Sequence, residues 1–189
     1  MRRIVAALAV CALGASALGF ATDGLRAFTA ESARRLDVAR SPRELPDVRL
    51  VDQRGRELRL HALPGERLYL EFVFTRCASV CGAMTRAFAR ASQEAPEDVR
   101  FVSITLDPEH DTLARLRDHA RRVGADGERW RFARIGDASE LRALLARLEV
   151  VVIPHPQLLF EHNAAIHELD ARRRLVAIHD LEDLDASAG

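Results

Sequence analysis

The sequence has no lysine, no net charge and few cysteines, and these shortages exclude several classes of protein. All 28 basic residues are arginine and are balanced by 28 acidic residues, so the chain lacks the basic excess of a nucleic-acid-binding protein. We attribute the missing lysine to compositional bias and assign it no function. Three cysteines are too few for a small domain held together by disulfides. With 48% hydrophobic residues over 189 positions, the composition predicts one soluble domain with a hydrophobic core.

Residues 1–22 are not expected to belong to this domain. Arg2 and Arg3 precede an uncharged apolar run over residues 4–21, and the first acidic residue is Asp23. A positive tip followed by such a run is typical of a secretory signal peptide or of an uncleaved membrane anchor. We favour the signal peptide and keep the anchor as the alternative. Both place the remaining chain outside the cytoplasm, in the periplasm, either free or tethered to the inner membrane.

Removing this segment changes the number of charged residues and the number of cysteines. Residues 1–22 contain two arginines and no acidic residue, which leaves 26 basic and 28 acidic residues. They also contain Cys11, which we interpret as an apolar residue of the signal segment, because Val10 is not the small residue that precedes a lipoprotein cysteine. The exported part therefore keeps only Cys77 and Cys81, and this pair is the first candidate for chemistry.

The pattern along the chain predicts a linker followed by one domain. Residues 23–44 show no sustained periodicity and are interpreted as a linker, or as a short helix around residues 29–36. The domain is expected over residues 45–189. It begins with two short strands over 48–51 and 58–60, joined by a turn near Gly55. These strands predict an N-terminal β-hairpin.

Strands and helices then alternate through the rest of the domain. Strands are expected over residues 68–74, 99–106, 130–135, 150–153, 158–160, 164–169 and 174–178, and helices over residues 81–95, 112–123 and 138–148. This order predicts the α/β class, with a mostly parallel central sheet and helices on both faces. The chain stops soon after the last strand, so a C-terminal helix is expected to be short or absent.

The two cysteines stand where a buried strand gives way to a helix. In Cys77-Ala78-Ser79-Val80-Cys81, hereafter the cysteine segment, residues four apart lie on one face if the helix has begun. The partial positive charge of a helix N-terminus favours thiolate over thiol. Three interpretations stay open at this point: a structural disulfide, a redox pair and a metal site. Redox pairs usually have two intervening residues instead of three, and two thiolates leave a metal short of ligands.

A third ligand would come from a histidine. The candidates are His61, His110, His119, His155, His162, His167 and His179. His162 stands directly after a loop and before the strand predicted over 164–169, a place where ligands gather in α/β sheets. His167 lies five positions further, and an odd separation along one strand points the two side chains to opposite faces.

Three segments together resemble one known family. Residues 74–81 (FTRCASVC), 107–112 (DPEHDT) and 161–166 (EHNAAI) are similar, in order and spacing, to the SCO/SenC family, and the resemblance covers residues 45–178. It implies a thioredoxin-like fold and copper delivery to cytochrome c oxidase. It further implies that Cys77, Cys81 and His162 bind copper as Cu(I), with one further donor for Cu(II).

The resemblance also implies transfer of copper to a recipient copper protein such as a cytochrome c oxidase subunit. We expect the chain to be a monomer. Asp107 and Asp111 would be structural or partner-facing, unless Asp111 merely caps the helix over 112–123. The alternative function is a thiol–disulfide oxidoreductase that keeps a partner's cysteines reduced, with Cys77 as the nucleophile and Cys81 resolving.

The chain departs from the family pattern at several positions. Ala78 and Gly82 stand where the family usually has proline, and Glu161 replaces the usual aspartate before the histidine. The loop before His162 is shorter than usual, and the C-terminal helix is reduced to residues 181–184. All three expected ligands are nevertheless present.

Overall fold

The computed structural model describes residues 2–24, 29–76, 80–155, 159–162 and 165–180. The chain divides into two compact units, residues 1–41 and 42–189. The first contains helix α1 (Arg2–Ala21) and helix α2 (Ala30–Arg40). Among the described residues, none of the helices combines the length and the hydropathy that a membrane span requires.

Helix α2 confirms the short helix expected after residue 29. Thr29 is its N-cap: the Thr29 side chain accepts a hydrogen bond from the backbone N–H of Ser32 at 3.0 Å. The backbone N–H of Thr29 in turn donates to the Ser32 hydroxyl at 3.0 Å. This reciprocal arrangement satisfies donors that a helix start otherwise leaves unpaired.

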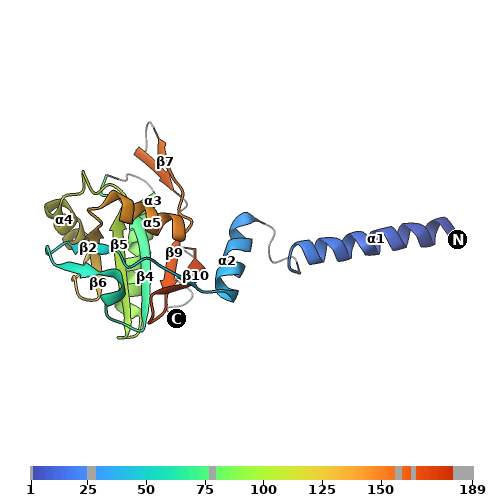
Figure 1. Ribbon diagram of the computed structural model, residues 1–189, viewed down its shortest axis with the longest axis horizontal. Coiled ribbons are helices and arrows are strands. Elements are labelled where there is room, and N and C mark those ends of the chain that lie inside the picture. The colour runs from blue at the N-terminus through green and yellow to red at the C-terminus, as the bar shows by residue number, and fades with distance from the viewer. Residues whose placement is uncertain (1, 25–28, 77–79, 156–158, 163–164, 181–189) are drawn as a thin grey trace. The chain divides into compact units, whose positions relative to one another are not determined.

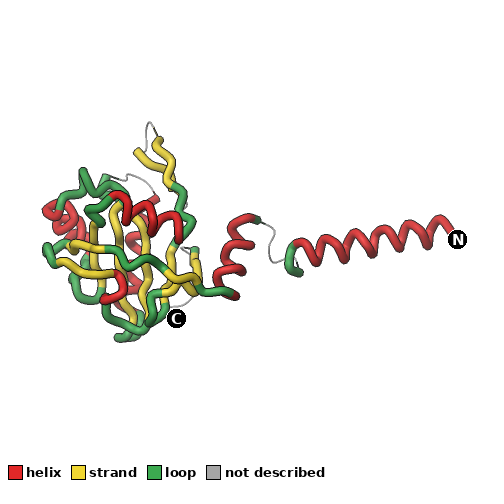
Figure 2. Tube along the Cα trace, viewed as in Figure 1, coloured by secondary structure: helices red, strands yellow, loops and turns green. Residues whose placement is uncertain are grey.

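The second unit is built on an eight-stranded sheet with the order β1-β10-β9-β4-β5-β6-β2-β3 (Figure 1). Its strands are β1 (Arg43–Glu44), β2 (Arg49–Asp52), β3 (Glu57–Arg59), β4 (Arg67–Val73), β5 (Val99–Thr105), β6 (Trp130–Arg134), β9 (Ile166–Leu169) and β10 (Arg174–His179). Its helices are α3 (Val80–Glu94), α4 (Leu113–Val123), α5 (Ala138–Arg147) and the short 3-10 helix η1 (Leu60–Ala62). A separate two-stranded sheet pairs β7 (Val152–His155) with β8 (Leu159–His162), and Figure 2 shows this hairpin projecting from the main sheet.

The α/β, thioredoxin-like class is confirmed, but the expectation of a mostly parallel sheet is wrong. Only β4, β5 and β6 pair in parallel; the other neighbours in the main sheet are antiparallel. The connections β2–β3 and β9–β10 are tight turns, too short for the crossover that parallel strands need. The turn in the first of these hairpins contains Gly55 at φ 83°, and the predicted N-terminal hairpin is therefore confirmed.

The direction of the crossovers decides which helix covers which face. The steps β4–α3–β5 and β5–α4–β6 run the same way across the sheet, and a right-handed crossover then puts α3 and α4 on one face. Their apolar residues share a core with the central strands that includes Phe88, Leu116 and Trp130. After β6 the chain returns toward β9, which brings α5 over the opposite face (Figure 1). Helices on both faces are thus confirmed, while residues 181–184 lie outside the described part.

Candidate metal centre

The cysteine segment begins where the buried central strand β4 ends. Strand β5 lies parallel to β4, and the backbone N–H of Leu106 donates to the Val73 carbonyl at 2.8 Å. The carboxyl ends of both strands therefore meet at one edge of the sheet, where ligands bind in α/β folds. Helix α3 then starts at Val80, so Cys81 is its second residue. Cys77 and the side chain of Cys81 lie outside the part of the chain that the structure describes.

Asp111 holds the chain just before the cysteine segment. Its side chain is fully buried and accepts hydrogen bonds from the backbone N–H of Thr75 at 3.0 Å and from the Thr75 hydroxyl at 2.5 Å. It also accepts from the Thr105 hydroxyl, at the end of β5, at 2.5 Å. Asp111 therefore ties three segments together two positions before Cys77.

The alternative interpretation of Asp111 as a helix cap is wrong. The N-cap of α4 is the next residue, Thr112, whose hydroxyl accepts from the backbone N–H of Arg115 at 3.4 Å. The carboxyl group of Asp111 points inward and accepts hydrogen bonds from Thr75 and Thr105 instead. Its role is structural, which is one of the two roles that the family resemblance implies.

Asp107 restrains Arg76, the residue that follows Thr75. Its carboxylate forms an ion pair with Arg76 at 2.5 Å, and the Asp107 side chain is only 12% exposed. The backbone N–H of Asp107 donates to the Thr105 hydroxyl at 3.0 Å. Arg76 directly precedes Cys77, so two acidic residues of the 107–112 motif restrain both residues before the first cysteine.

Substituting Asp111 tests this restraint. We expect Asp111→Asn to lower the free energy of unfolding by about 1–2 kcal/mol, because the single oxygen of an amide replaces two carboxyl oxygens that together accept three hydrogen bonds. Urea denaturation of the reduced full-length chain measures the change. The matched control is Asp118→Asn, since Asp118 is exposed and contacts only Arg121 of its own helix among the interactions described; it should change stability little. Equal effects of the two substitutions would contradict the assigned role.

The structure places His162 and His167 in different sheets. His162 is the last residue of β8, opposite Val152 of β7, and not in the loop that enters the next strand. His167 belongs to β9, is fully buried, and packs edge-on against Phe72 with ring centroids 6.1 Å apart. The argument from odd spacing along one strand therefore does not apply. The side chains of His155 and His162 lie outside the part of the chain that the structure describes.

No group of three or more histidine, cysteine or acidic side chains able to hold a metal is found among the described residues. The proposed set of Cys77, Cys81 and His162 depends on side chains beyond that description. What the structure brings together is the scaffold: the end of β4, the start of α3, and the two aspartates that hold the residues between them.

A buried acid on β4 was not anticipated from the sequence. Glu71 is completely buried, and its Oε1 accepts a hydrogen bond from the Ser103 hydroxyl at 2.5 Å. Ser103 in turn accepts from Trp130 Nε1 at 2.9 Å. Burial raises the pKa of Glu71 to about 8, so the carboxyl is largely neutral at pH 7. The available signal was a single acidic residue inside the apolar run 68–74.

Comparisons with known proteins agree on one family. A family model described as SCO1/SenC matches residues 39–188. The SCO1 protein homolog of Bacillus subtilis (strain 168) is 26% identical over 117 residues, which cover 60% of this chain and 61% of that protein. The chain thus matches about three fifths of this relative's length.

Solved structures show the same fold. Arabidopsis thaliana ScoI with copper bound has a TM-score of 0.64 with this chain, with 20% identity and coverage of 76% of this chain and 94% of that one. BsSco, described as a member of the Sco family of cytochrome c oxidase assembly proteins, has a TM-score of 0.66 with 19% identity, covering 78% and 92%.

Proposed function

The chain belongs to the SCO1/SenC family, and we propose from this that it binds copper through Cys77, Cys81 and His162. The observation that carries the proposal is the family match over residues 39–188, which includes all three residues. A relative of the same fold, Arabidopsis ScoI, is described with copper bound. Copper is here the cargo that the protein carries.

The donor types suit this metal. Thiolates and imidazole are the side chains that favour copper, and two thiolates with one imidazole complete a three-coordinate Cu(I) site. Cys81 lies in the first turn of α3, where the helix macrodipole favours the deprotonated thiol that a metal requires. One further donor would accommodate Cu(II).

The protein's own residues contribute to the site by restraining the backbone before it. Asp111 holds Thr75, and Asp107 holds Arg76. A backbone that is already ordered loses less conformational entropy when the metal binds. The two aspartates therefore act as positioning residues.

The copper is proposed to pass by ligand exchange to a recipient copper protein, such as a subunit of cytochrome c oxidase. The description of BsSco as belonging to a family of cytochrome c oxidase assembly proteins supports this recipient. The protein is proposed to work outside the cytoplasm as a monomer, with residues 1–22 as a signal peptide or anchor, residues 23–44 as a linker and residues 45–189 as the copper-binding domain.

Thiol–disulfide exchange is the second candidate function. It is favoured by the position of the cysteine pair in the sequence where the central strand β4 is followed by helix α3 of a thioredoxin-like fold, since a helix N-terminus favours the thiolate that exchange requires. Such a reaction needs Cys77 and Cys81 but not His162, so the histidine separates the two functions.

His162→Ala is therefore the deciding variant. We expect it to weaken Cu(I) binding by about 10–100-fold, because a three-coordinate site loses one ligand. Competition of the reduced full-length chain with a Cu(I) chelator measures the affinity. His61→Ala is the control, since the His61 side chain is exposed and bonds to the Leu45 carbonyl. Unchanged affinity in His162→Ala would reject the three-ligand site and favour thiol exchange.

A further inference from the structure

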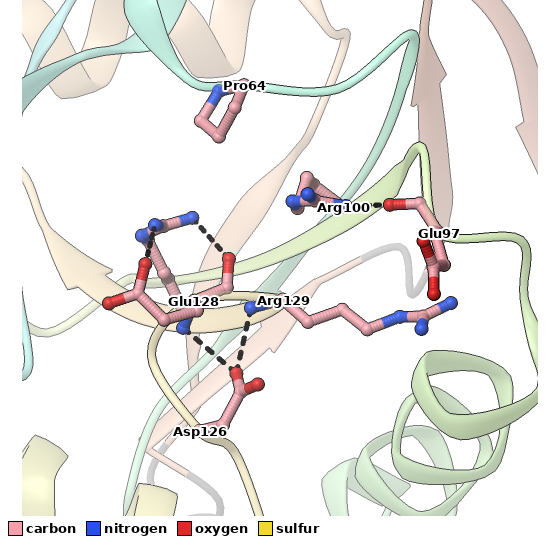
Figure 3. Close-up of a pocket in the computed structure, with 7 residues that line it drawn as sticks. Pro64, Glu97, Arg100, Asp126, Glu128 and Arg129 are labelled. Atoms are coloured by element: carbon pink, nitrogen blue, oxygen red, sulfur yellow. Dashed lines mark hydrogen bonds and ion pairs between the residues drawn. The ribbon is translucent and has the colours of Figure 1, made fainter.

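A pocket lined by three arginines lies at the end of the sheet opposite the carboxyl end of β4. Arg100 and Arg131 are the second residues of the parallel strands β5 and β6, whereas the cysteine segment follows the last residue of β4. The pocket has a volume of about 310 Å³. Figure 3 shows Pro64 on one side, Arg100 beside it, and Glu128 and Arg129 across from it.

Two of the arginines have no carboxylate partner within the described part of the chain. Arg100 Nη1 donates to the Val99 carbonyl at 3.0 Å and to the Glu97 carbonyl. Arg129 Nη2 donates to the Pro96 carbonyl at 2.9 Å and to the Ala95 carbonyl. Neutral backbone groups thus hold both guanidinium groups in place and leave their charges uncompensated.

The acidic residues of the pocket are engaged elsewhere or exposed. The Glu128 carboxylate is shared by Arg54 at 2.7 Å, Arg56 at 2.9 Å and Arg131 at 3.1 Å. Asp126 Oδ1 accepts from the backbone N–H groups of residues 128, 129 and 130. Glu97 is exposed. Neither Glu128 nor Asp126 therefore neutralises Arg100 or Arg129.

Arg131 adds a buried cation to the lining of the pocket. It is 6% exposed, its Nη1 donates to the Glu128 carbonyl at 2.7 Å, and its Nε has no hydrogen-bond partner among the described groups. Burial, together with the like charges of Arg56 and Arg100, lowers its pKa. A bound anion would relieve this repulsion between neighbouring cations.

We propose that this pocket binds a small phosphate-type oxyanion, with Arg100 and Arg129 as its main donors and Arg131 as the supporting charge. Arginine presents several N–H donors and forms strong charge-assisted hydrogen bonds to phosphate oxygens. The three arginines come from different positions on two strands and a turn, and a tetrahedral oxyanion offers acceptors in more directions than a planar carboxylate. None of the residues that line the pocket is among the proposed copper ligands.

Titration with inorganic phosphate tests the site. The full-length chain is titrated at constant ionic strength, with sodium chloride as the reference, and amide chemical shifts are recorded. We expect saturable shifts at residues 100–101 and 126–131. Arg100→Gln and Arg129→Gln should each weaken binding about tenfold, the loss of one charge-assisted hydrogen bond. Arg142→Gln, an exposed arginine of α5, is the matched control and should leave binding unchanged.

Two further measurements distinguish loss of the anion site from loss of the fold. Urea denaturation in chloride shows whether each variant is folded, and Arg100→Lys, which keeps the charge, should recover part of the affinity. A phosphate response no greater than that of chloride, or full affinity in a folded Arg100→Gln variant, would overturn the proposal. Cu(I) affinity should be the same in Arg100→Gln and the parent, so failure of one proposal does not imply failure of the other.

A second experiment distinguishes a lipid headgroup from free phosphate as the ligand. Phosphatidylcholine vesicles with and without phosphatidic acid are sedimented with the parent chain and with Arg100→Gln. Recruitment that requires both phosphatidic acid and Arg100 supports a lipid headgroup as the ligand. Binding of inorganic phosphate without such recruitment supports the free ion.

Discussion

Replacing either Cys77 or Cys81 with serine is expected to weaken Cu(I) binding by well over 100-fold. The hydroxyl of serine is a hard, neutral donor at pH 7, whereas Cu(I) favours soft thiolates. Changes in outer-shell partners of metal ligands typically cost about 10–100-fold in affinity, and loss of a thiolate that binds the metal directly should exceed that range. The measurement is chelator competition of the reduced full-length chain without oxygen.

Cys11→Ser provides a matched control within the same chain. Cys11 is an exposed thiol in α1, in the first unit and outside the domain that the family model matches. Its removal should leave the affinity and the stoichiometry of one Cu(I) per chain unchanged. If Cys77→Ser or Cys81→Ser bound Cu(I) as tightly as Cys11→Ser, the cysteine pair would not be the copper site.

Glu71→Gln is expected to stabilise the protein by about 3 kcal/mol at pH 7 and to remove the contribution of this carboxyl to the pH dependence of stability between pH 4.5 and pH 8. The folded-state pKa of Glu71 is raised from 4.5 to about 8 by burial. Between these values the unfolded chain has lost the proton while the folded protein keeps it. The contribution of Glu71 to stability is therefore highest below pH 4.5, falls by about 1.4 kcal/mol per pH unit as the pH rises, and levels off above pH 8.

Glutamine resembles the protonated acid in shape and carries no charge, so the folded state no longer binds an extra proton. Urea denaturation of the parent and the variant at several pH values between 4.5 and 8 gives the two slopes. Glu109→Gln, at an exposed position, is the control and should keep the slope of the parent. The same slope in Glu71→Gln and the parent would show that Glu71 is not the group responsible.

Glu71 and Asp111 are two buried acids of one domain that differ in the number of hydrogen-bond donors around them. Asp111 accepts three hydrogen bonds, from Thr75 and Thr105. Glu71 has one described partner, Ser103, and its Oε2 has none among the described groups. A buried carboxylate is stable only where enough donors replace water. Asp111 restrains the chain before the cysteine segment because two of its donors belong to Thr75.

Local patterns in the sequence were sufficient to locate the elements and the cysteine pair. The apolar run over 68–74 and the helical spacing after Cys81 predict β4 and α3, and the turn at Gly55 predicts the first hairpin. These features depend on residues a few positions apart, so periodicity and turn chemistry report them directly. The assignment of copper required the family pattern, because two thiols alone also fit redox exchange.

Only the tertiary structure decided how distant segments use the remaining polar residues. The pairing of β9 with β4 makes the sheet mixed, and it buries His167 beside Phe72. Thr75 and Asp111 are 36 positions apart in the chain, and Glu71 and Ser103 are 32 apart. No short-range pattern encodes such contacts, since they exist only once β4 and β5 lie side by side. The parallel pairing of β5 with β6 in turn assembles the arginine pocket at the far end of the sheet.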